Sequence, residues 1–592
     1  MLPGRWFMTG CGLAALALIA AGWIHPLPVS LLATEVLATI VGLFVFGSFK
    51  YQIHKNALTY GMLLVIVATF TQLPASTWHT EIAQHGAASW IQQHVLTFAG
   101  LDDLVHADTM LFILGLTLFV SVIAQTRVLE GITFFLLRKN GGRILPTVIA
   151  VTAVVAITSG LLGGVSMIGL TIRTFVIILM LGAAPIAAVR YAVMVCTAVT
   201  TICGVWTAYG EPPNLIMKAN LFPNLDNLFF LYYGLPVAVA SYVAIAWQLK
   251  RRLGNLHVDL DNMDVLDINA EDVRFLQASR HGEVISPVEL IEGHREDLGH
   301  DTAERVMERL RQGESLGIAM IRADVPELTR KNLLGHYVSD ELADGLDRHY
   351  MYAQEGLDEQ AFMAELAVDE SLAAIAYDRK WAQRIAGFAL LPFFALLIIH
   401  GLTSEVPLFL ASFAGFAAAL PGMFKLRRMR GLAFREAHLE YAEYYFLFPL
   451  FLSVTLLTSA GFFDVMQTLV VRGIDVLGHS HVAFAQFLGS TVLSAILDNN
   501  IVADFASRGL HGLGLNVLKF FAMAQIAGYA LGGCWTHIGC AQSVVAYAFI
   551  QRDVDERYTP VRWIKEITPV ILQTMALMGA IIYLEGALLR HL

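Results

Sequence analysis

The stretch Ser494-Ala-Ile-Leu-Asp-Asn-Asn500 combines a carboxylate, two amides and a small hydroxyl side chain within an apolar run. An ionisable residue inside a membrane costs about 2.5–3.5 kcal/mol on insertion scales, so such residues are rare and usually functional. Asp498, Asn499 and Asn500 supply hard oxygen ligands suited to a small cation such as sodium. Because a dry site favours the protonated carboxyl group, Asp498 could exchange a proton for sodium. The alternative is that Asp498 only caps a half-helix.

Two similar heptapeptides provide a second group of candidate residues. Gly204-Val-Trp-Thr-Ala-Tyr-Gly210 and Gly533-Cys-Trp-Thr-His-Ile-Gly539 both read Gly-x-Trp-Thr-x-x-Gly, and both interrupt long apolar segments. A helix broken within a membrane frees backbone carbonyl groups that can coordinate a cation. The shared threonines, Thr207 and Thr536, could add their hydroxyl and carbonyl oxygens. A kink that serves packing alone is the alternative.

Three further polar residues accompany these predicted breaks. Glu211 directly follows the first heptapeptide, and Asn214 lies about one turn later. Glu211 is either a second titrating group or the cap of the following half-helix. His537 lies within the second heptapeptide and could relay a proton, although a hydrogen-bonded structural histidine is the simpler interpretation.

Two apolar segments, 144–182 and 481–510, carry small and polar residues at their centres and are expected to be re-entrant hairpins. Ser159 and Ser166 lie near the first expected tip, and Ser494 lies near the second. These serines either contact an ion or are simply small residues that allow close packing.

Composition excludes several classes of protein. The chain has 592 residues, of which 56% are hydrophobic and 15% are charged, whereas an average soluble domain has about 25% charged residues. A soluble enzyme, a nucleic-acid-binding protein and a disordered chain are therefore excluded. The sequence shows no metal-ligand spacing, phosphate-binding loop or nucleophile triad, so we expect no enzyme activity and no cofactor. The expected partners are the lipid bilayer and transported ions.

The sequence predicts an all-α polytopic membrane protein with about eleven transmembrane helices, each needing about 20 apolar residues. We expect five regions: N-terminal helices and an interfacial linker (1–106), a first transport repeat (107–249), a polar helical insertion domain (250–382), connecting helices (383–445) and a second transport repeat (446–592). The expected N-terminal spans are 8–25, 29–49 and 57–73. The oligomeric state stays open between a monomer and a homodimer.

The distribution of lysine and arginine predicts the orientation, because such residues collect in cytoplasmic loops. If both hairpins return to their own side, most basic residues, including Lys50, Arg143 and Arg428, lie in the cytoplasm. The N-terminus and the insertion domain are then cytoplasmic, and the C-terminus is periplasmic. The two repeats, 107–249 and 446–588, consequently cross the membrane in opposite directions. Inverted repeats with broken helices are the architecture of many secondary transporters.

Three motifs resemble those of the ion-transporter superfamily, which includes NhaD-type sodium/proton antiporters, arsenite pumps and carboxylate transporters. Ser494 to Asn500 is similar to its hairpin-tip motif Ser-Ala-x-x-Asp-Asn. Gly210-Glu-Pro-Pro-Asn-Leu-Ile216 is similar to its Gly-x-Pro-Pro-Asn-Leu-Ile motif, and Gly532-Gly-Cys-Trp-Thr-His-Ile-Gly539 resembles a stretch of NhaD-type antiporters. The chain departs from the superfamily at the first hairpin tip, Thr158 to Ser166, which has no Asp-Asn pair, and at Gln542-Ser543, which stands where the first copy has Pro213-Asn214.

The resemblance implies sodium/proton antiport across a bacterial inner membrane, with Asp498 as the exchange group. Sodium-coupled transport of a carboxylate or an inorganic anion is the alternative within the same superfamily, although no arginine lies at either expected break. A membrane sensor that signals through residues 250–382 is a third hypothesis, but that segment contains no kinase, cyclase or receiver motif.

The orientation can be tested with topology reporters. A reporter inserted near residue 313 should report the cytoplasm, and one fused after Leu592 should report the periplasm, because the basic residues fix the loops between them. The measurement is paired alkaline phosphatase and fluorescent-protein activity in intact cells. If both positions report the same side, the inverted arrangement is wrong.

Overall fold

The computed structural model describes most of the chain: residues 2–25, 53, 55–70, 77–126, 128–181, 184–253, 256, 287–312, 316–326, 329–330, 333, 359–403, 406–424, 427–459, 461–555 and 557–589. Within these residues the secondary structure is helical and contains no strand. The all-α prediction is thus confirmed for the described part of the chain. The expected span at 29–49 lies outside it.

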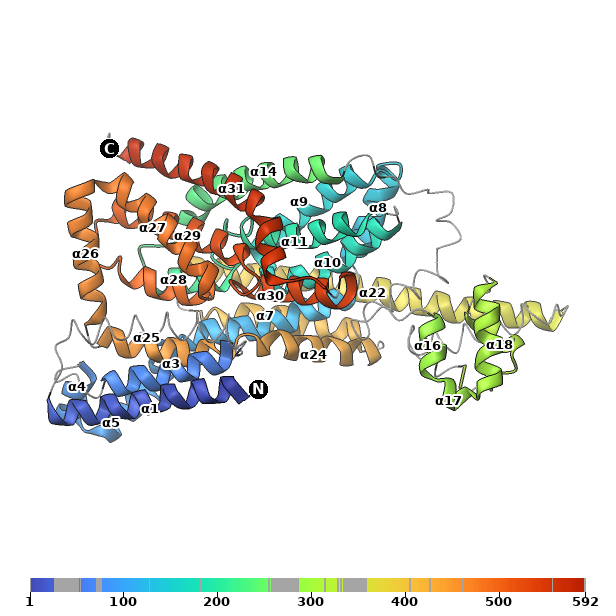
Figure 1. The fold of residues 1–592 in the computed structure, drawn as a ribbon, viewed down its shortest axis with the longest axis horizontal. Coiled ribbons are helices and arrows are strands. Elements are labelled where there is room, and N and C mark those ends of the chain that lie inside the picture. Colours follow the sequence, from blue (N-terminus) through green and yellow to red (C-terminus); the bar gives the residue numbers. More distant parts are fainter. Residues whose placement is uncertain are drawn as a thin grey trace.

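The N-terminal region contains two long helices followed by three short ones. Helices α1 (Leu2–Ile24) and α3 (Lys55–Phe70) pack against each other. The short helices α4 (Thr77–His85), α5 (Ala87–His94) and α6 (Phe98–Val105) occupy the expected interfacial linker. Figure 1 shows this region along one side of the helical bundle.

The first half of the bundle follows a definite order of elements: a long helix, a short helix, a two-helix hairpin, an interrupted helix and a final long helix. These are α7 (Ala107–Gln125), α8 (Val128–Lys139), the hairpin α9 (Ile144–Leu162) and α10 (Gly164–Leu181), the interrupted pair α11 (Ile186–Thr201) and α12 (Pro212–Asn220), and α13 (Asn227–Phe229), η2 (Phe230–Gly234) and α14 (Leu235–Leu253) as one continuous run.

The same order recurs in the second half. Its elements are α24 (Arg427–Ala442) and α25 (Leu447–Ser459), the short helix α26 (Phe462–Leu477), the hairpin α27 (His479–Ile496) and α28 (Asn499–Arg508), the interrupted pair α29 (Leu515–Trp535) and α30 (Ala541–Phe549) with η5 (Ile550–Val554), and the final helix α31 (Pro560–Leu589).

The breaks fall where the sequence cannot continue a helix. The first gap, residues 202–211, ends at Pro212 and Pro213, whose fixed φ suits the first turn of α12. The second gap, residues 536–540, holds Thr536 and Cys540 in extended conformations. In the first hairpin the turn is made by Gly163 at φ 82°, a conformation that favours glycine.

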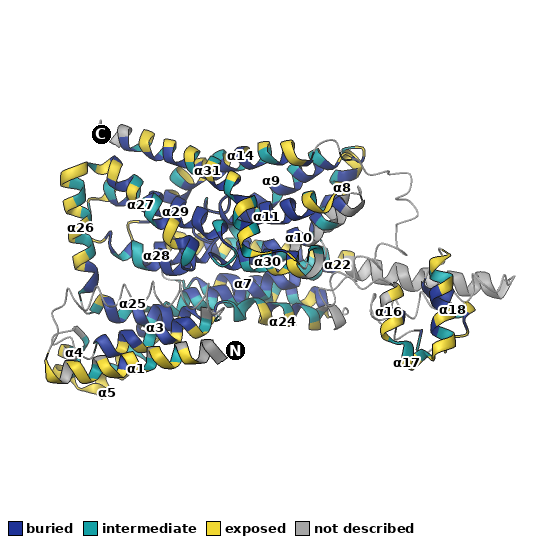
Figure 2. Cartoon of the chain, viewed as in Figure 1, coloured by how far each residue is buried: buried dark blue, intermediate teal, exposed yellow. Residues whose placement is uncertain are grey.

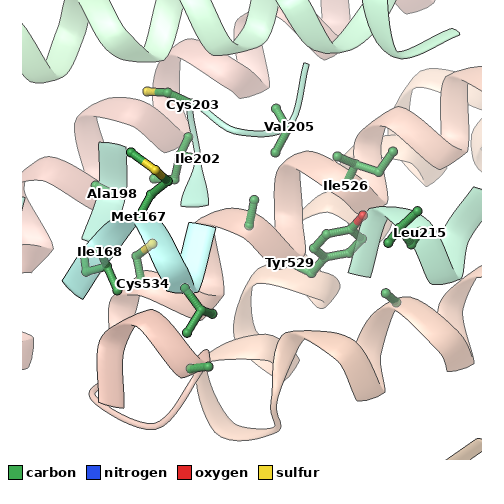
Figure 3. Packing of buried hydrophobic residues seen from close by; sticks show 14 of the residues in the cluster. Met167, Ile168, Ala198, Ile202, Cys203, Val205, Leu215, Ile526, Tyr529 and Cys534 are labelled. Carbon is green, nitrogen blue, oxygen red and sulfur yellow. The ribbon is translucent and has the colours of Figure 1, made fainter. Parts of the chain in front are cut away.

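The two halves interlock through their interrupted helices. Helix α12 of the first half packs against α28 of the second, and α30 of the second packs against α10 of the first. Helices α11 and α29 meet between them, and Figure 2 shows both as largely buried. Figure 3 shows part of the shared core, where Leu215 of α12 and Tyr529 of α29 belong to one cluster.

Between the halves lie the insertion and two connecting helices. Helices α16 (Pro287–Gly293), α17 (Arg295–Leu298), α18 (His300–Arg311) and α19 (Leu316–Arg322) have a small core of their own, which includes Ile291, Val306 and Met320. Figure 1 shows α16, α17 and α18 beyond one end of the bundle. Helix α22 (Glu359–Thr403) continues through position 382 without a break, so the expected boundary of the insertion falls inside one helix. Helix α23 (Phe409–Ala419) and η4 (Leu420–Met423) follow and pack against α22.

In the described part of the chain, 7 helices are long and apolar enough to cross a membrane. They are Ala107–Gln125, Ile144–Leu162, Asn227–Leu253, Lys380–Gly401, Arg430–Ser459, Leu515–Trp535 and Pro560–Gly586. Shorter apolar helices include Asn56–Phe70, Ile186–Thr201 and Phe409–Met423. Ile144–Leu162 is the first arm of the expected hairpin, and its length alone would also allow it to cross.

Candidate functional site

Each gap is tied to the hairpin of its own half by the threonine that the two heptapeptides share. The Thr207 hydroxyl donates to the Gly160 carbonyl of α9, and the Thr536 hydroxyl donates to the Ala495 carbonyl of α27 at 2.6 Å. Thr207 Oγ1 also accepts from the Gly210 backbone N–H at 3.1 Å, which shapes the gap itself. Both predicted threonines therefore hold the gap backbone, and their hydroxyl hydrogens are directed at protein carbonyls.

A second pair of equivalent contacts joins the hairpin tips to the same gaps. The Gly164 N–H, at the start of α10, donates to the Gly210 carbonyl at 2.9 Å. The Asn499 N–H, at the start of α28, donates to the Gly539 carbonyl at 3.0 Å. Each bond satisfies one N–H at a helix start and one carbonyl outside a helix, both of which need a partner where water is excluded.

The last glycine of each heptapeptide has no room for a side chain. A Cβ on Gly210 would lie 2.5 Å from the Gly204 carbonyl oxygen and 2.6 Å from Gly160 Cα. A Cβ on Gly539 would lie 2.8 Å from the carbonyl oxygens of both Gly533 and Ser494. The repeated glycines thus allow the gap and the hairpin tip to touch, which explains their spacing in the sequence.

Asp498 lies at the tip of the second hairpin and is only 3% exposed. Its carboxylate accepts from the Asn500 backbone N–H at 3.0 Å and from Asn500 Nδ2 at 2.6 Å, so Asp498 does cap α28. The Oδ1 atom of Asn500 is buried and accepts no hydrogen bond from the described residues. A buried amide oxygen without a partner is unusual and marks a place where water or an ion can bind. Asp498, Asn499 and Asn500 are thus the residues that could hold a cation here.

Glu211 lies at the first hairpin tip, although it belongs to the first gap. Glu211 is 2% exposed, and its side chain makes no capping hydrogen bond to α12. Instead, Gln542 Nε2 donates to both Glu211 carboxylate oxygens, at 2.7 and 2.8 Å. The prediction that the Glu211 side chain caps α12 is therefore wrong. A Cβ placed on Gly164 would collide with Glu211 Oε1, so this carboxylate rests directly on the hairpin tip.

Asn214 also joins the two halves. It is fully buried, its Nδ2 donates to the Thr207 carbonyl at 3.0 Å, and its Oδ1 accepts from the Tyr529 hydroxyl at 2.6 Å. The polar groups of α12 and α29 therefore satisfy each other across the centre of the bundle. Gln542 and Tyr529 were not among the predicted site residues. The only sequence signal for Gln542 is that Gln542-Ser543 stands where the first copy has Pro213-Asn214.

The predicted serines behave differently from one another. Ser159 donates to the Ala156 carbonyl at 3.2 Å, and Ser494 donates to the Tyr529 carbonyl at 2.8 Å. Both contacts fit the close-packing interpretation. Ser166, in contrast, donates to a carboxylate oxygen of Glu440, which comes from α24. The His537 ring lies against that of Tyr547 in a tilted arrangement, with centroids 4.7 Å apart and planes at 50°, and its Nδ1 is buried without a hydrogen-bond partner in the described residues.

Four carboxylates interact electrostatically with one buried tyrosine. Tyr444 is 4% exposed, and the four carboxylates belong to Glu440, Glu211, Asp498 and Glu443. Glu211 and Asp498 also interact with each other. Within the described part of the chain, no lysine or arginine nitrogen lies within 4.0 Å of Glu211 or Glu440. Like charges repel strongly where water is excluded, so a proton or a cation bound among these carboxylates would lower their mutual repulsion.

A separate buried ion pair lies at the other end of α28. Asp504 is fully buried and accepts from Arg508 Nε at 3.0 Å and from Asn220 Nδ2 of α12 at 2.8 Å. Arg508 also reaches His106, the residue before α7, at 3.3 Å. Burial beside the Arg508 guanidinium lowers the pKa of His106 to about 4, and the nearby Asp504 only partly offsets this effect. The pair therefore fastens α28 to α12 and to the start of α7.

Comparison with known proteins assigns no family to the chain. No protein-family model matches the sequence, and no curated protein matches it. Within the described residues, no group of three or more His, Cys, Asp or Glu side chains could hold a metal ion.

The glycine contacts give a testable prediction. Gly539→Ala should lower the thermal unfolding midpoint in detergent, because the added Cβ meets two backbone oxygens at 2.8 Å and overpacking costs about 1–3 kcal/mol. The matched control is Gly489→Ala in α27, where nothing lies within 4 Å of the new Cβ. That change should be neutral or stabilise the helix by about 0.5–1 kcal/mol. Equal midpoints for the two variants would contradict the close contact between gap and hairpin.

Proposed function

We propose that this chain is a secondary active transporter that exchanges sodium, or another monovalent cation, for protons. One observation carries the proposal: the buried Asp498 carboxylate lies at a break between helices, beside an Asn500 amide oxygen that has no hydrogen-bond partner among the described residues. A carboxylate with amide oxygens suits a small hard cation. The same carboxylate can hold a proton instead, and that competition is what an antiporter requires.

The arrangement of the two halves supports the same proposal. Both halves have a hairpin whose tip is hydrogen-bonded to the gap of its own interrupted helix, through Gly164 and Gly210 in one and Asn499 and Gly539 in the other. We take the halves to be inverted repeats with re-entrant hairpins, the arrangement of many secondary transporters. Irregular backbone within a membrane persists only where protein or a cavity covers it, so the gaps belong near the transported ion.

In the proposed cycle, Asp498 is the exchange group and its neighbours supply neutral oxygens. Asn499 and Asn500 contribute amide oxygens, and the Glu211 carboxyl group interacts electrostatically with Asp498. When sodium binds, the proton leaves Asp498 because one carboxylate cannot hold both. The interrupted helices and hairpins, which are joined by the hydrogen bonds of Thr207 and Thr536 and by those of the hairpin tips, would then move together and expose the site to the opposite side.

Sodium-coupled transport of a carboxylate or an inorganic anion is the second candidate, and one buried cation favours it. Lys218 of α12 is 9% exposed, and its Nζ donates to Asn227 Oδ1 at 3.0 Å and to the Tyr209 hydroxyl at 3.3 Å. A lysine just beyond the first gap could pair with an anionic substrate. Sodium-dependent uptake of a labelled dicarboxylate or of sulfate into vesicles, without sodium-driven proton movement, would favour this candidate over antiport.

The antiport proposal is tested by proton flux in reconstituted vesicles at several pH values. Asp498→Asn should reduce sodium-driven proton flux to the level of empty vesicles, because the amide keeps the side-chain size but can neither exchange a proton nor neutralise a cation. Asp498→Glu should keep part of the flux with a shifted pH dependence, since the charge survives about one methylene away. Wild-type flux and pH profile in Asp498→Asn would refute the mechanism.

Two controls separate the exchange group from a general loss of charge. Asp475→Asn removes an exposed carboxylate of α26 and should leave the flux unchanged. Glu211→Gln removes the second central carboxylate while keeping a partner for Gln542. A large loss of flux in Glu211→Gln would identify Glu211 as a second titrating group, whereas a small loss would limit it to holding Gln542.

A further inference from the structure

Glu440 is a partly buried carboxylate outside both hairpins and both gaps. It lies on α24, which packs against α7, and its carboxylate accepts from the Ser166 hydroxyl of α10. Glu436 lies one helical turn earlier on the same helix and accepts from Gln125 Nε2 at 2.8 Å. Residues four apart lie on the same face of a helix. The two carboxylates thus form a row that leads from the basic start of α24 toward the first hairpin tip.

A small cavity continues this row into the bundle. It has a volume of about 20 Å³ and is lined by Glu440, Ser166, Tyr444, Thr117 and Gly163, together with apolar side chains. About 10–15 Å³ is enough for one water molecule, and hydroxyl groups of this lining could supply its hydrogen-bond partners. The cavity therefore has room for a single water between Glu440 and the hairpin tip.

Tyr444 connects the row to the centre of the site. It follows the end of α24, lines the same cavity, and interacts electrostatically with Glu440, Glu211 and Asp498 as well as with Glu443. A tyrosine hydroxyl both donates and accepts a hydrogen bond. Glu440 and Tyr444 thus line one cavity with room for a water, and Tyr444 in turn interacts electrostatically with the two central carboxylates.

We propose that Glu440 relays the proton between the aqueous end of α24 and the central carboxylates. This inference rests on the proposed antiport function. In the relay, protonated Glu440 gives its proton to a water in the cavity or to the Tyr444 hydroxyl, so its O–H bond breaks as a new O–H bond forms. The group that receives this proton gives up a different proton. Glu211 or Asp498 takes that second proton. Glu440 then regains a proton from the side of Glu436. The proton transfers together leave the net charge unchanged, and sodium takes no part in the relay.

The relay predicts that proton movement and sodium movement can be separated. In vesicles, Glu440→Gln should lose sodium-driven proton flux by about tenfold or more, since glutamine cannot pass on a proton. Exchange of labelled sodium for unlabelled sodium needs no proton and should stay within about twofold of the wild type. Glu440→Asp should restore part of the proton flux with a changed pH profile, because Glu436 and Tyr444 still face the shorter acid.

Glu585→Gln is the matched control, since it removes another partly buried carboxylate from the final helix α31. It should leave both fluxes unchanged. Unchanged proton flux in Glu440→Gln would overturn the relay, and loss of both fluxes would overturn it as well, because Glu440 would then belong to the cation site or the fold. A wild-type protein with neither flux would instead refute the proposed antiport function itself.

Discussion

The requirement that every buried backbone group find a partner shapes the centre of this molecule. Two long helices are interrupted, and each interruption leaves carbonyl and N–H groups without intrahelical bonds. The hairpin tips supply the missing partners: the Gly164 N–H bonds the Gly210 carbonyl, and the Asn499 N–H bonds the Gly539 carbonyl. The contact is possible only because a glycine stands at each gap. The hairpins and the gaps are consequently one structural unit in each half.

The polar side chains at the centre satisfy groups of the opposite half. Gln542 holds the Glu211 carboxylate, Tyr529 holds Asn214, and Asn220 holds Asp504. These contacts join α30, α29 and α28 of the second half to the first gap and α12. Because a buried polar group without a partner costs about 1–3 kcal/mol, movement of one half relative to the other must break these bonds together or preserve them together. Such coupling is suited to a protein that alternates between two arrangements.

Apolar runs and helix-breaking residues predicted most of the individual elements. The interruptions fall at the two heptapeptides, because Pro212 and the repeated glycines leave little choice. Packing partners were harder to predict, since a single sequence does not say which helices meet. Nothing in the sequence places Glu440 of α24 beside Ser166 of the first hairpin, so Glu440 is not among the predicted site residues. Gln542 is also absent from the predicted site residues, because only the fold brings it to Glu211.

Competition between sodium and protons for Asp498 is the central claim, and it can be measured without transport. Sodium chloride added to the purified protein in weak buffer near neutral pH should release about one proton per molecule, because binding of one ion displaces the other. Choline chloride at the same ionic strength should release none. We expect this release in the wild-type protein and none in Asp498→Asn. No sodium-specific release in the wild-type protein, or equal release in the variant, would contradict it.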